Sequence, residues 1–301
     1  MQNGKRNALI WLRNDLRLLD HYAFHHAAKE CEGVVAYYSL DPNHFTETPW
    51  GFNKTGPFRS QFLIETLHQL SSDLAKKNIS LIVETQAPEK GISHWVEQLH
   101  ITDLHYQEEW TREEEVTAQA VRNELPPTLK IHNYCDQFLF HPDDLPMEIE
   151  NLPEVFTVFR KACEKQSKVR PCFPEISAFP KENCLPQEFK IPAITDLGFS
   201  PVAQPPHTAF PFKGGSRAGQ QRMEHYFWET EKLSFYKQTR NGLLGLDYSS
   251  KFSAWLANGS LSARQIYWEI KEYEAQIQKN QSTYWLIFEL IWRDYFKFIS
   301  L

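Results

Sequence analysis

Several common signatures are missing from this chain of 301 residues. It has no apolar run long enough to cross a bilayer, and its polar N-terminus lacks the apolar segment of a signal peptide, so we expect an intracellular, cytoplasmic protein. Its five cysteines form no C-x-x-C pair, which argues against both a zinc site and a disulfide framework. The chain also shows no internal repeat and no low-complexity tract.

The G-x-G-x-x-G fingerprint of nicotinamide dinucleotide enzymes is absent as well. The first apolar run leads into RNDLRLLD at 13–20, which contains no glycine, so we exclude an NAD dehydrogenase. We expect the arginines and aspartates of this stretch to form a salt-bridged loop. His21 and His25 follow at a spacing that a metal could use, but no carboxylate or cysteine pattern completes a site. We expect a solvated helix face there and no bound metal.

Short apolar runs alternate with segments of helical periodicity over residues 1–135. The runs expected as strands are 8–12, 33–38, 80–84, 101–106 and 128–134. The expected helices lie near 20–31, 57–77, 88–99 and 111–125, with Pro57 and Pro88 suited to first-turn positions. This alternation predicts a doubly wound α/β domain with a five-stranded parallel sheet, whose ligands bind at the carboxyl ends of the strands.

The rest of the chain divides into a connector and a helical domain. Residues 136–204 are rich in proline, with one helix-like piece at 153–166, and we expect a long connector ordered by packing. Residues 205–301 are expected to be all-helical, with helices near 217–232, 234–240, 253–258, 263–278 and 283–299. This last part has 12 Lys and Arg against 9 Asp and Glu, a net +3, within a chain of net charge −6. A DNA-binding face is therefore permitted there.

The stretch from residue 236 to 264 concentrates groups that suit a phosphate. Ser249, Ser250, Lys251 and Ser253 place hydroxyls and an ammonium on a short connection that enters a helix. Such a connection, with the free N–H groups of the helix, can bind a phosphate or pyrophosphate. The alternative is a plain N-cap with Ser253 as the capping residue, and spacing does not separate the two.

The final run, QSTYWLIFELIWRDYFKFISL, has helical periodicity. In a helix, Trp285, Glu289, Trp292 and Phe296 would share one face, which places an ionisable group within an aromatic stripe. The alternative for Glu289 is an intrahelical ion pair with Arg293, four residues further on. The run continues to the last residue without a stop signal, so we expect an N-terminal portion of a longer protein with an incomplete helical domain.

These motifs resemble those of the photolyase/cryptochrome family, in particular its DASH branch. The resemblance rests on YKQTRNG, SSKFSAWLANGSLS and ELIWRDYF in the helical part, on WLRNDLRLLDH at the N-terminus, and on LPEVFTVFRKACE and FKGGSRAG between them. The motifs follow the order of the family over essentially the whole chain. The resemblance implies an N-terminal antenna-binding domain at 1–135, a connector at 136–204, and the first part of an FAD-binding domain at 205–301.

The resemblance also implies cofactors and the residues that hold them. FAD would be bound by Tyr236, Ser249, Ser250, Lys251, Phe252, Ser253, Trp285 and Arg293. A folate antenna, 5,10-methenyltetrahydrofolate, would lie beside a strand end, with Gln107, Glu108 and Glu109 as candidates. Related photolyases carry a tryptophan three residues before the position of Glu289. This chain has Leu286 there, with Trp285 one residue further back.

The activity implied by the resemblance is that of a deoxyribodipyrimidine photolyase-like lyase. In blue light, reduced flavin would pass an electron to a cyclobutane pyrimidine dimer that has left the base stack. Glu289 would stabilise the dimer's carbonyl, Trp292 would stack on the flipped bases, and Arg240 would contact a backbone phosphate. The DASH branch implies a preference for single-stranded, UV-damaged DNA, and we expect the protein to be a monomer. The alternatives are a flavin photoreceptor that signals without repair, or an inactive fragment.

Overall fold

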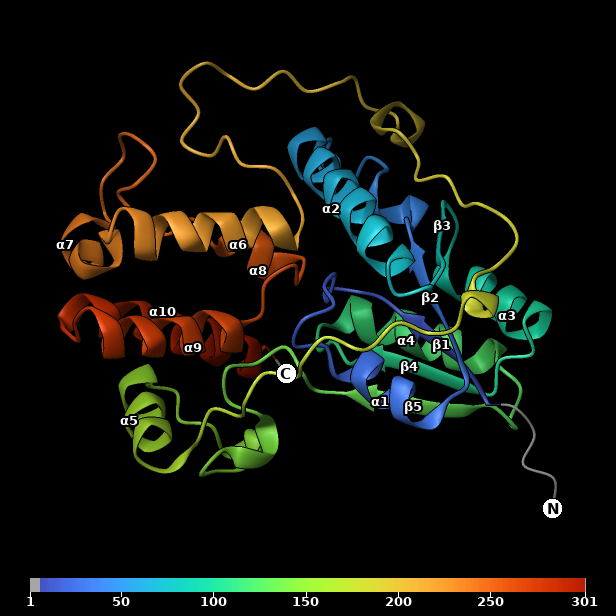
Figure 1. The fold of residues 1–301 in the computed structure, drawn as a ribbon, viewed down its shortest axis with the longest axis horizontal. Helices are drawn as coiled ribbons and strands as arrows, with labels where there is room; N and C mark the ends of the chain where they lie inside the picture. Colours follow the sequence, from blue (N-terminus) through green and yellow to red (C-terminus); the bar gives the residue numbers. More distant parts are fainter. Residues whose placement is uncertain (1–5, 301) are drawn as a thin grey trace.

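The computed structural model describes residues 6–300, and its N-terminal half contains one fully parallel sheet. The strand order is β3-β2-β1-β4-β5, which is the doubly wound arrangement that the alternating pattern predicts (Figure 1). The strands are β1 (Asn7–Trp11), β2 (Gly33–Ser39), β3 (Leu81–Glu84), β4 (Asp103–Gln107) and β5 (Lys130–Tyr134). In register, Ala8 of β1 lies between Val34 of β2 and Asp103 of β4.

Two pairs of helices cover the two faces of this sheet. The helices are α1 (Tyr22–Glu30), α2 (Pro57–Ala75), α3 (Pro88–Gln98) and α4 (Arg112–Glu124). Alternate residues of β1 enter different cores: Ile10 packs in the core under α1 and α2, whereas Leu9 packs in the core under α3 and α4. Pro57 and Pro88 begin their helices as expected, because a first-turn position needs no N–H donor.

The proline-rich connector is ordered by packing against both halves of the molecule. It contains α5 (Phe156–Gln166), several short 3₁₀ turns and otherwise irregular backbone that crosses between the halves (Figure 1). Phe159 and Cys163 of α5 are fully buried in the core of the helical part. Ile176 and Leu197 further along are buried in the core under α1 and α2. The connector therefore contributes side chains to two cores instead of acting as a free linker.

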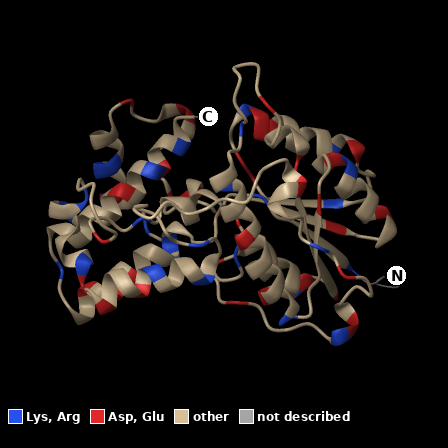
Figure 2. Cartoon of the chain, turned by 90° about the horizontal axis from the view of Figure 1, so that it is seen from above, with Lys and Arg blue, Asp and Glu red and all other residues tan. Residues whose placement is uncertain are grey.

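The C-terminal part is helical. Its elements are α6 (Ser216–Glu224), α7 (Tyr236–Thr239), α8 (Ser253–Ala257), α9 (Ala263–Gln276) and α10 (Gln281–Phe298). The helix expected at 217–232 is shorter than predicted, because a π-helical turn follows α6 and Glu231 adopts a left-handed φ of 49°. Capping boxes at Ser262 and Asn280 fix the starts of α9 and α10. Basic and acidic positions are interspersed along these helices (Figure 2).

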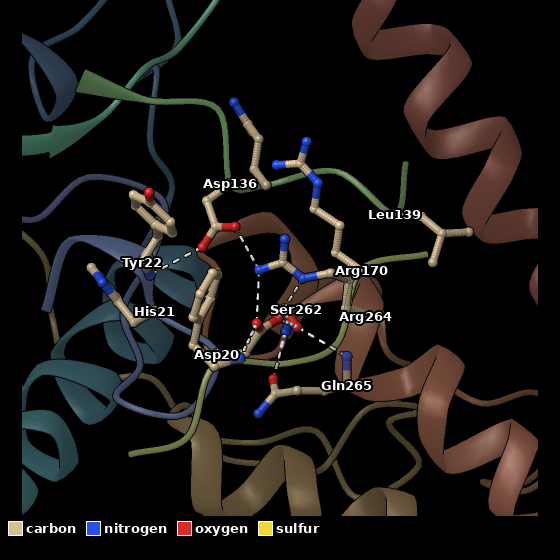
Figure 3. Close-up of polar contacts among 12 residues, drawn as sticks. Asp20, His21, Tyr22, Asp136, Leu139, Arg170, Ser262, Arg264 and Gln265 are labelled. Atoms are coloured by element: carbon tan, nitrogen blue, oxygen red, sulfur yellow. Dashed lines mark hydrogen bonds and ion pairs between the residues drawn. The ribbon is translucent and has the colours of Figure 1, made fainter. Parts of the chain in front are cut away.

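The loop after β1 docks onto the helical part through buried ion pairs (Figure 3). Asp20 accepts hydrogen bonds from Arg264 Nε and Nη2 at 3.1 and 2.7 Å and from Ser262 Oγ at 2.5 Å. Arg17 donates to the backbone oxygen of Gly259 at 3.0 Å, and Asp136 pairs with Arg264 at 2.5 Å. The expected pairing of these residues is found only in part within the loop, where Arg17 donates to the Asp20 backbone oxygen at 3.0 and 2.7 Å, because the Asp20 carboxylate pairs with Arg264 on the helical domain.

His21 is the second correction in this region. The sequence predicts it on a solvated helix face, but it is only 3 % exposed and caps α1 by accepting from the Phe24 N–H. Its Nε2 lies 3.1 Å from Oδ2 of the Asp15 carboxylate. The two groups are close enough for electrostatic attraction, but neither of these two atoms forms a hydrogen bond to the described residues. None of the helices within residues 6–300 combines the length and apolarity needed to span a membrane.

Candidate functional site

A cavity of about 570 Å³ lies between the α/β domain and the helical part. On the α/β side its wall includes Asn14, which follows β1, and Glu109, which follows β4. These two strands are neighbours at the point where the strand order reverses. Ligands of doubly wound sheets bind in the crevice at this point, so the cavity occupies the position that the sequence pattern indicates.

Six of the residues predicted to bind cofactor or substrate line this cavity on the helical side. They are Tyr236, Ser250, Phe252, Ser253, Glu289 and Arg293. Lys251, expected to face a phosphate, instead extends its ammonium over the Tyr248 ring at 3.4 Å and has a left-handed φ of 66°. Ser249 does not line the cavity and presents its backbone oxygen to Arg222 at 2.9 Å.

The connection to α8 is not a serine-capped helix start. Phe252 occupies the N-cap position, and its side chain has no polar atom that could cap the helix. Ser253 is the first helical residue. The capping alternative for Ser253 is therefore wrong. Since α8 has only five residues, its dipole contributes little, and the hydroxyls of Ser250 and Ser253 are the main polar groups that this segment offers to the cavity.

Glu289 forms an ion pair with Arg240 of the segment that follows α7. Both side chains are 30 % exposed, so the pair lies at the rim of the cavity. The alternative pairing of Glu289 with Arg293 is wrong. Arg293 Nη1 donates to the Gln137 backbone oxygen at 2.8 Å and to Asp294 at 3.2 Å, which turns it toward the connector.

Several aromatic residues of α10 pack against α5, whereas Trp285 lies beside the cations of the α7 segment. The Trp292 ring stacks on Phe156 with centroids 3.5 Å apart, and it also stacks on Phe296. Trp285 stacks on Phe288, and the Arg240 guanidinium lies 5.4 Å from its ring centroid. Neither tryptophan lines the cavity, but Arg240 contacts both Glu289 and Trp285, so these two residues lie on the same side of α10.

Glu109 and Glu108, the antenna candidates, point in different directions. Glu109 is 6 % exposed, lines the cavity and accepts from Asn14 Nδ2 at 3.1 Å. Burial raises the pKa of Glu109, while the charge of Lys297 on α10 acts to lower it. Glu108 lies outside the cavity, where its carboxylate receives the Cys135 thiol at 3.6 Å. Gln107 donates to Glu109 at 3.3 Å and is also buried.

Each wall of the cavity carries charges of both signs. The α10 wall has Glu289, Arg293 and Lys297, whereas the α/β wall has Arg59 of α2 with Glu109 and Glu114. Burial, followed by repulsion from Arg293, lowers the pKa of Lys297 to about 8. A base whose pKa lies this near neutrality loses its charge readily on further desolvation.

A buried group of metal-ligating type lies under α1, away from this cavity. Metal-binding atoms of Cys31, Asp103 and His105 lie within 4.8 Å of one another. Asp103 Oδ1 is held by Arg6 at 2.5 Å and His132 at 2.9 Å, and Oδ2 accepts from Arg6 at 3.1 Å. With the Asp103 oxygens occupied in this way, Cys31 and His105 remain as free ligands, whereas structural zinc sites use four. The absence of a bound metal stays a prediction.

The sequence reasoning missed the residues that hold this site in place. Arg222 of α6 contacts four residues of the loop before α8, and Arg264 of α9 joins the two domains. The neighbouring sequence does not indicate that either arginine is buried, because an arginine on a helix usually lies at the surface. Their spatial partners are 24 to 28 and 244 residues away in the chain. Gly259, next to these contacts, indicates only a helix stop in the sequence.

Comparisons with known proteins agree with the fold and the motifs. The family profile described as DNA photolyase matches residues 8–181. "Cryptochrome DASH" of Gloeobacter violaceus is 44% identical over 98% of this chain and 59% of that protein, and the Synechocystis protein of the same name is 41% identical over 100% and 61%. The chain thus spans about 60% of the length of these relatives.

Solved structures give the same result. A crystal structure of a Synechocystis cryptochrome matches with a TM-score of 0.93 at 40% identity, covering 100% of this chain and 62% of that one. A class III photolyase from Agrobacterium tumefaciens, 17% identical, shares the fold with a TM-score of 0.81 over 99% of this chain and 60% of that one. The chain belongs to the DNA photolyase family, and its curated relatives include DASH cryptochromes.

Proposed function

We propose that this chain supplies the dimer-recognising edge and one wall of the FAD cavity of a blue-light-dependent DNA repair protein. Its reaction would be the splitting of cyclobutane pyrimidine dimers, preferentially in single-stranded DNA. The observation that carries the proposal is the Glu289–Arg240 ion pair at the rim of a cavity lined by Tyr236, Ser250 and Ser253. A carboxylate for the damaged bases and a cation for the backbone thus adjoin the cofactor space.

The residues of the cavity fit a flavin dinucleotide. Its volume of about 570 Å³ lies within the range of sites for cofactor-sized ligands. Phe252 and Leu286 offer apolar surface, and Ser250 and Ser253 offer hydroxyl groups. Burial raises the pKa of Tyr236 to about 12, so its phenol stays neutral and can donate a hydrogen bond. FAD, when bound and reduced, supplies the electron that light drives to the dimer.

The remaining steps depend on side chains of this chain. Glu289 would face the carbonyl of a flipped pyrimidine dimer, and Arg240 would exchange part of its contact with Glu289 for a DNA phosphate. Arg293 would border the cofactor from α10. Base stacking by Trp292, which the family resemblance implies, would require its ring to give up part of its contact with Phe156.

The proposed antenna, 5,10-methenyltetrahydrofolate, concerns the α/β wall. Glu109 is the better candidate for contacting it, because Glu108 lies outside the cavity. Glu109 is also buried with a raised pKa, and burial is the main cause. The antenna would then lie close to the proposed FAD residues, as energy transfer to the flavin requires.

Absorption and repair measurements on the full-length protein test this function. We expect flavin bands in the purified protein, with an added near-ultraviolet shoulder if the folate is bound. We also expect blue light to remove dimers from a UV-irradiated single-stranded oligonucleotide. Glu289→Gln should reduce this repair, whereas Glu272→Gln on the exposed side of α9 should not.

Four results would each contradict part of the proposal. Flavin bands without repair of single-stranded or duplex DNA would favour a photoreceptor that signals without repair. Full repair by Glu289→Gln would remove Glu289 from the mechanism. A colourless full-length protein would exclude both flavin functions, whereas a colourless 301-residue chain beside a yellow full-length protein would identify the chain as an inactive fragment.

A further inference from the structure

Arg222 is a buried arginine that faces a loop instead of solvent. It is 3 % exposed and extends from α6 toward the segment between α7 and α8. Its Nε donates to the backbone oxygen of Ser250 at 3.1 Å, and its Nη1 pairs with the Asp247 carboxylate at 2.6 Å. Its Nη2 donates to the backbone oxygens of Leu246 at 3.2 Å and Ser249 at 2.9 Å. One guanidinium thus holds four residues of a single loop.

This loop has little else to fix its shape. The chain between Thr239 and Ser253, all of which the structure describes, forms neither helix nor strand. Leu243 and Leu244 are 84 % and 91 % exposed, so apolar burial does not anchor its first half. Gly245 and Lys251 have left-handed φ values of 81° and 66°, conformations that need support from their surroundings. The contacts of Arg222 therefore restrain its second half, together with the His225–Asp247 hydrogen bond and the burial of Phe252.

The chemistry of these contacts requires arginine. Three backbone oxygens and one carboxylate surround the guanidinium, and only a planar fork with five N–H donors can reach all of them. The group also lies 5.0 Å from the Phe212 ring centroid and 4.9 Å from that of Tyr226. This packing fixes the direction of the fork. A lysine would keep the charge but lose most of these hydrogen bonds.

Ser250 links this anchor to the cavity. Its backbone oxygen accepts from Arg222, while the residue lines the cavity together with Tyr236 and Ser253. We propose that Arg222 is a positioning residue, which holds the Leu246–Ser250 loop in the shape that presents the hydroxyls of Ser250 and Ser253 to the diphosphate of the cofactor. This inference rests on the proposed function, because it takes the diphosphate to be that of FAD. Arg222 does not line the cavity and acts only through the loop.

Asp247 pairs with Arg222 through a charge-assisted hydrogen bond. Burial acts to raise the pKa of Asp247, but hydrogen bonds from Arg222 and His225 outweigh it and lower that pKa. Asp247 therefore stays ionised near neutral pH and keeps the pair with Arg222 intact. Charge-assisted hydrogen bonds are stronger than neutral ones, so this end of the loop is held more firmly than its exposed leucines.

A comparison of two ligands on the full-length protein tests the proposal. FAD carries a diphosphate and riboflavin carries none, while both present the same ring. We expect Arg222→Lys to weaken FAD binding by at least about tenfold and riboflavin binding by less than about twofold. Hydrogen exchange of residues 246–253 in the cofactor-free protein should become faster. Arg217→Lys is the matched control on the same helix, because Arg217 is exposed and pairs with Asp73 of α2.

The outcomes separate this proposal from the function on which it rests. Unchanged FAD affinity in Arg222→Lys would overturn the positioning role, even if the wild type binds FAD and repairs dimers. An equal loss for FAD and riboflavin would also overturn it, because it would indicate a general loss of the fold. A wild type that binds FAD without repairing DNA would instead contradict the proposed function and leave the ligand comparison valid.

Discussion

Gly259 lies against the backbone of Asn14, on the loop that follows β1. A Cβ atom at position 259 would be 1.9 Å from the Asn14 carbonyl oxygen, a distance that non-bonded atoms do not reach. Gly259 also has a φ of 71°, in the left-handed region that side chains disfavour. The two domains can therefore approach this closely only because position 259 has no side chain.

Gly259→Ala should separate the domains at this contact. We expect the free energy of unfolding to fall by about 2–4 kcal/mol, from steric overlap together with the left-handed conformation. Gly198→Ala is the matched control, because Gly198 has a φ of 83° but no described atom within 4 Å of the place that a Cβ atom would occupy. The control should lose only about 1 kcal/mol. Urea unfolding measures both, and equal losses would show that steric overlap with Asn14 contributes nothing.

Arg264→Met should expose the role of the buried ion pairs that join the domains. The change would leave Asp20 and Asp136 without their shared cation and should lower the free energy of unfolding by about 3–5 kcal/mol. Arg217→Met, which removes an exposed pair with Asp73, should cost less than about 1 kcal/mol. Urea unfolding at neutral pH compares the two variants.

The loss in Arg264→Met should also depend on pH. Burial raises the pKa of Asp136, and Arg264 is the strongest opposing influence, so removing Arg264 should raise this pKa further. The folded variant then binds a proton at pH values where the unfolded chain, with an ordinary Asp pKa of about 4, does not. Its free energy of unfolding should fall as the pH rises through this interval. A difference from the wild type that is as large at about pH 5 as at about pH 8 would contradict this account.

The strands and long helices follow from local pattern, whereas the site depends on contacts between distant segments. The inner strands of the sheet are predictable because they are apolar runs buried on both faces, as in Leu9 and Ile10 of β1, whereas the edge strand β5 is polar and largely exposed. Helical spacing favours the pairing of Glu289 with Arg293, but a residue 49 positions away provides the actual partner. Local spacing cannot decide between Arg293 and Arg240 as the partner of Glu289, since it contains no information about how α7 lies against α10.

Trp292 should contribute mainly to packing in the free protein. Its ring stacks on Phe156 of α5, so Trp292→Ala should lower the free energy of unfolding by about 3 kcal/mol, whereas Trp292→Phe keeps a stacked ring and should cost about 1 kcal/mol. Thermal unfolding measures both. If Trp292→Phe were as stable as the wild type but bound a dimer-containing oligonucleotide much more weakly, base stacking would be the main role of Trp292.

Glu289→Gln and Arg240→Gln should separate DNA binding from repair. In the free protein Arg240 is paired with Glu289, so neutralising Glu289 releases a cation for the DNA backbone. Glu289→Gln should therefore bind single-stranded DNA as tightly as the wild type, or slightly more tightly, while repair falls. Arg240→Gln should weaken binding and reduce the slope of log affinity against log salt by about 0.7, the value for one phosphate on a single strand. Anisotropy titrations over a range of salt concentrations measure both slopes.

If Glu289→Gln instead lost affinity to the same extent as Arg240→Gln, the carboxylate would contribute to ground-state binding. Its effect on repair would then no longer identify a role in the reaction.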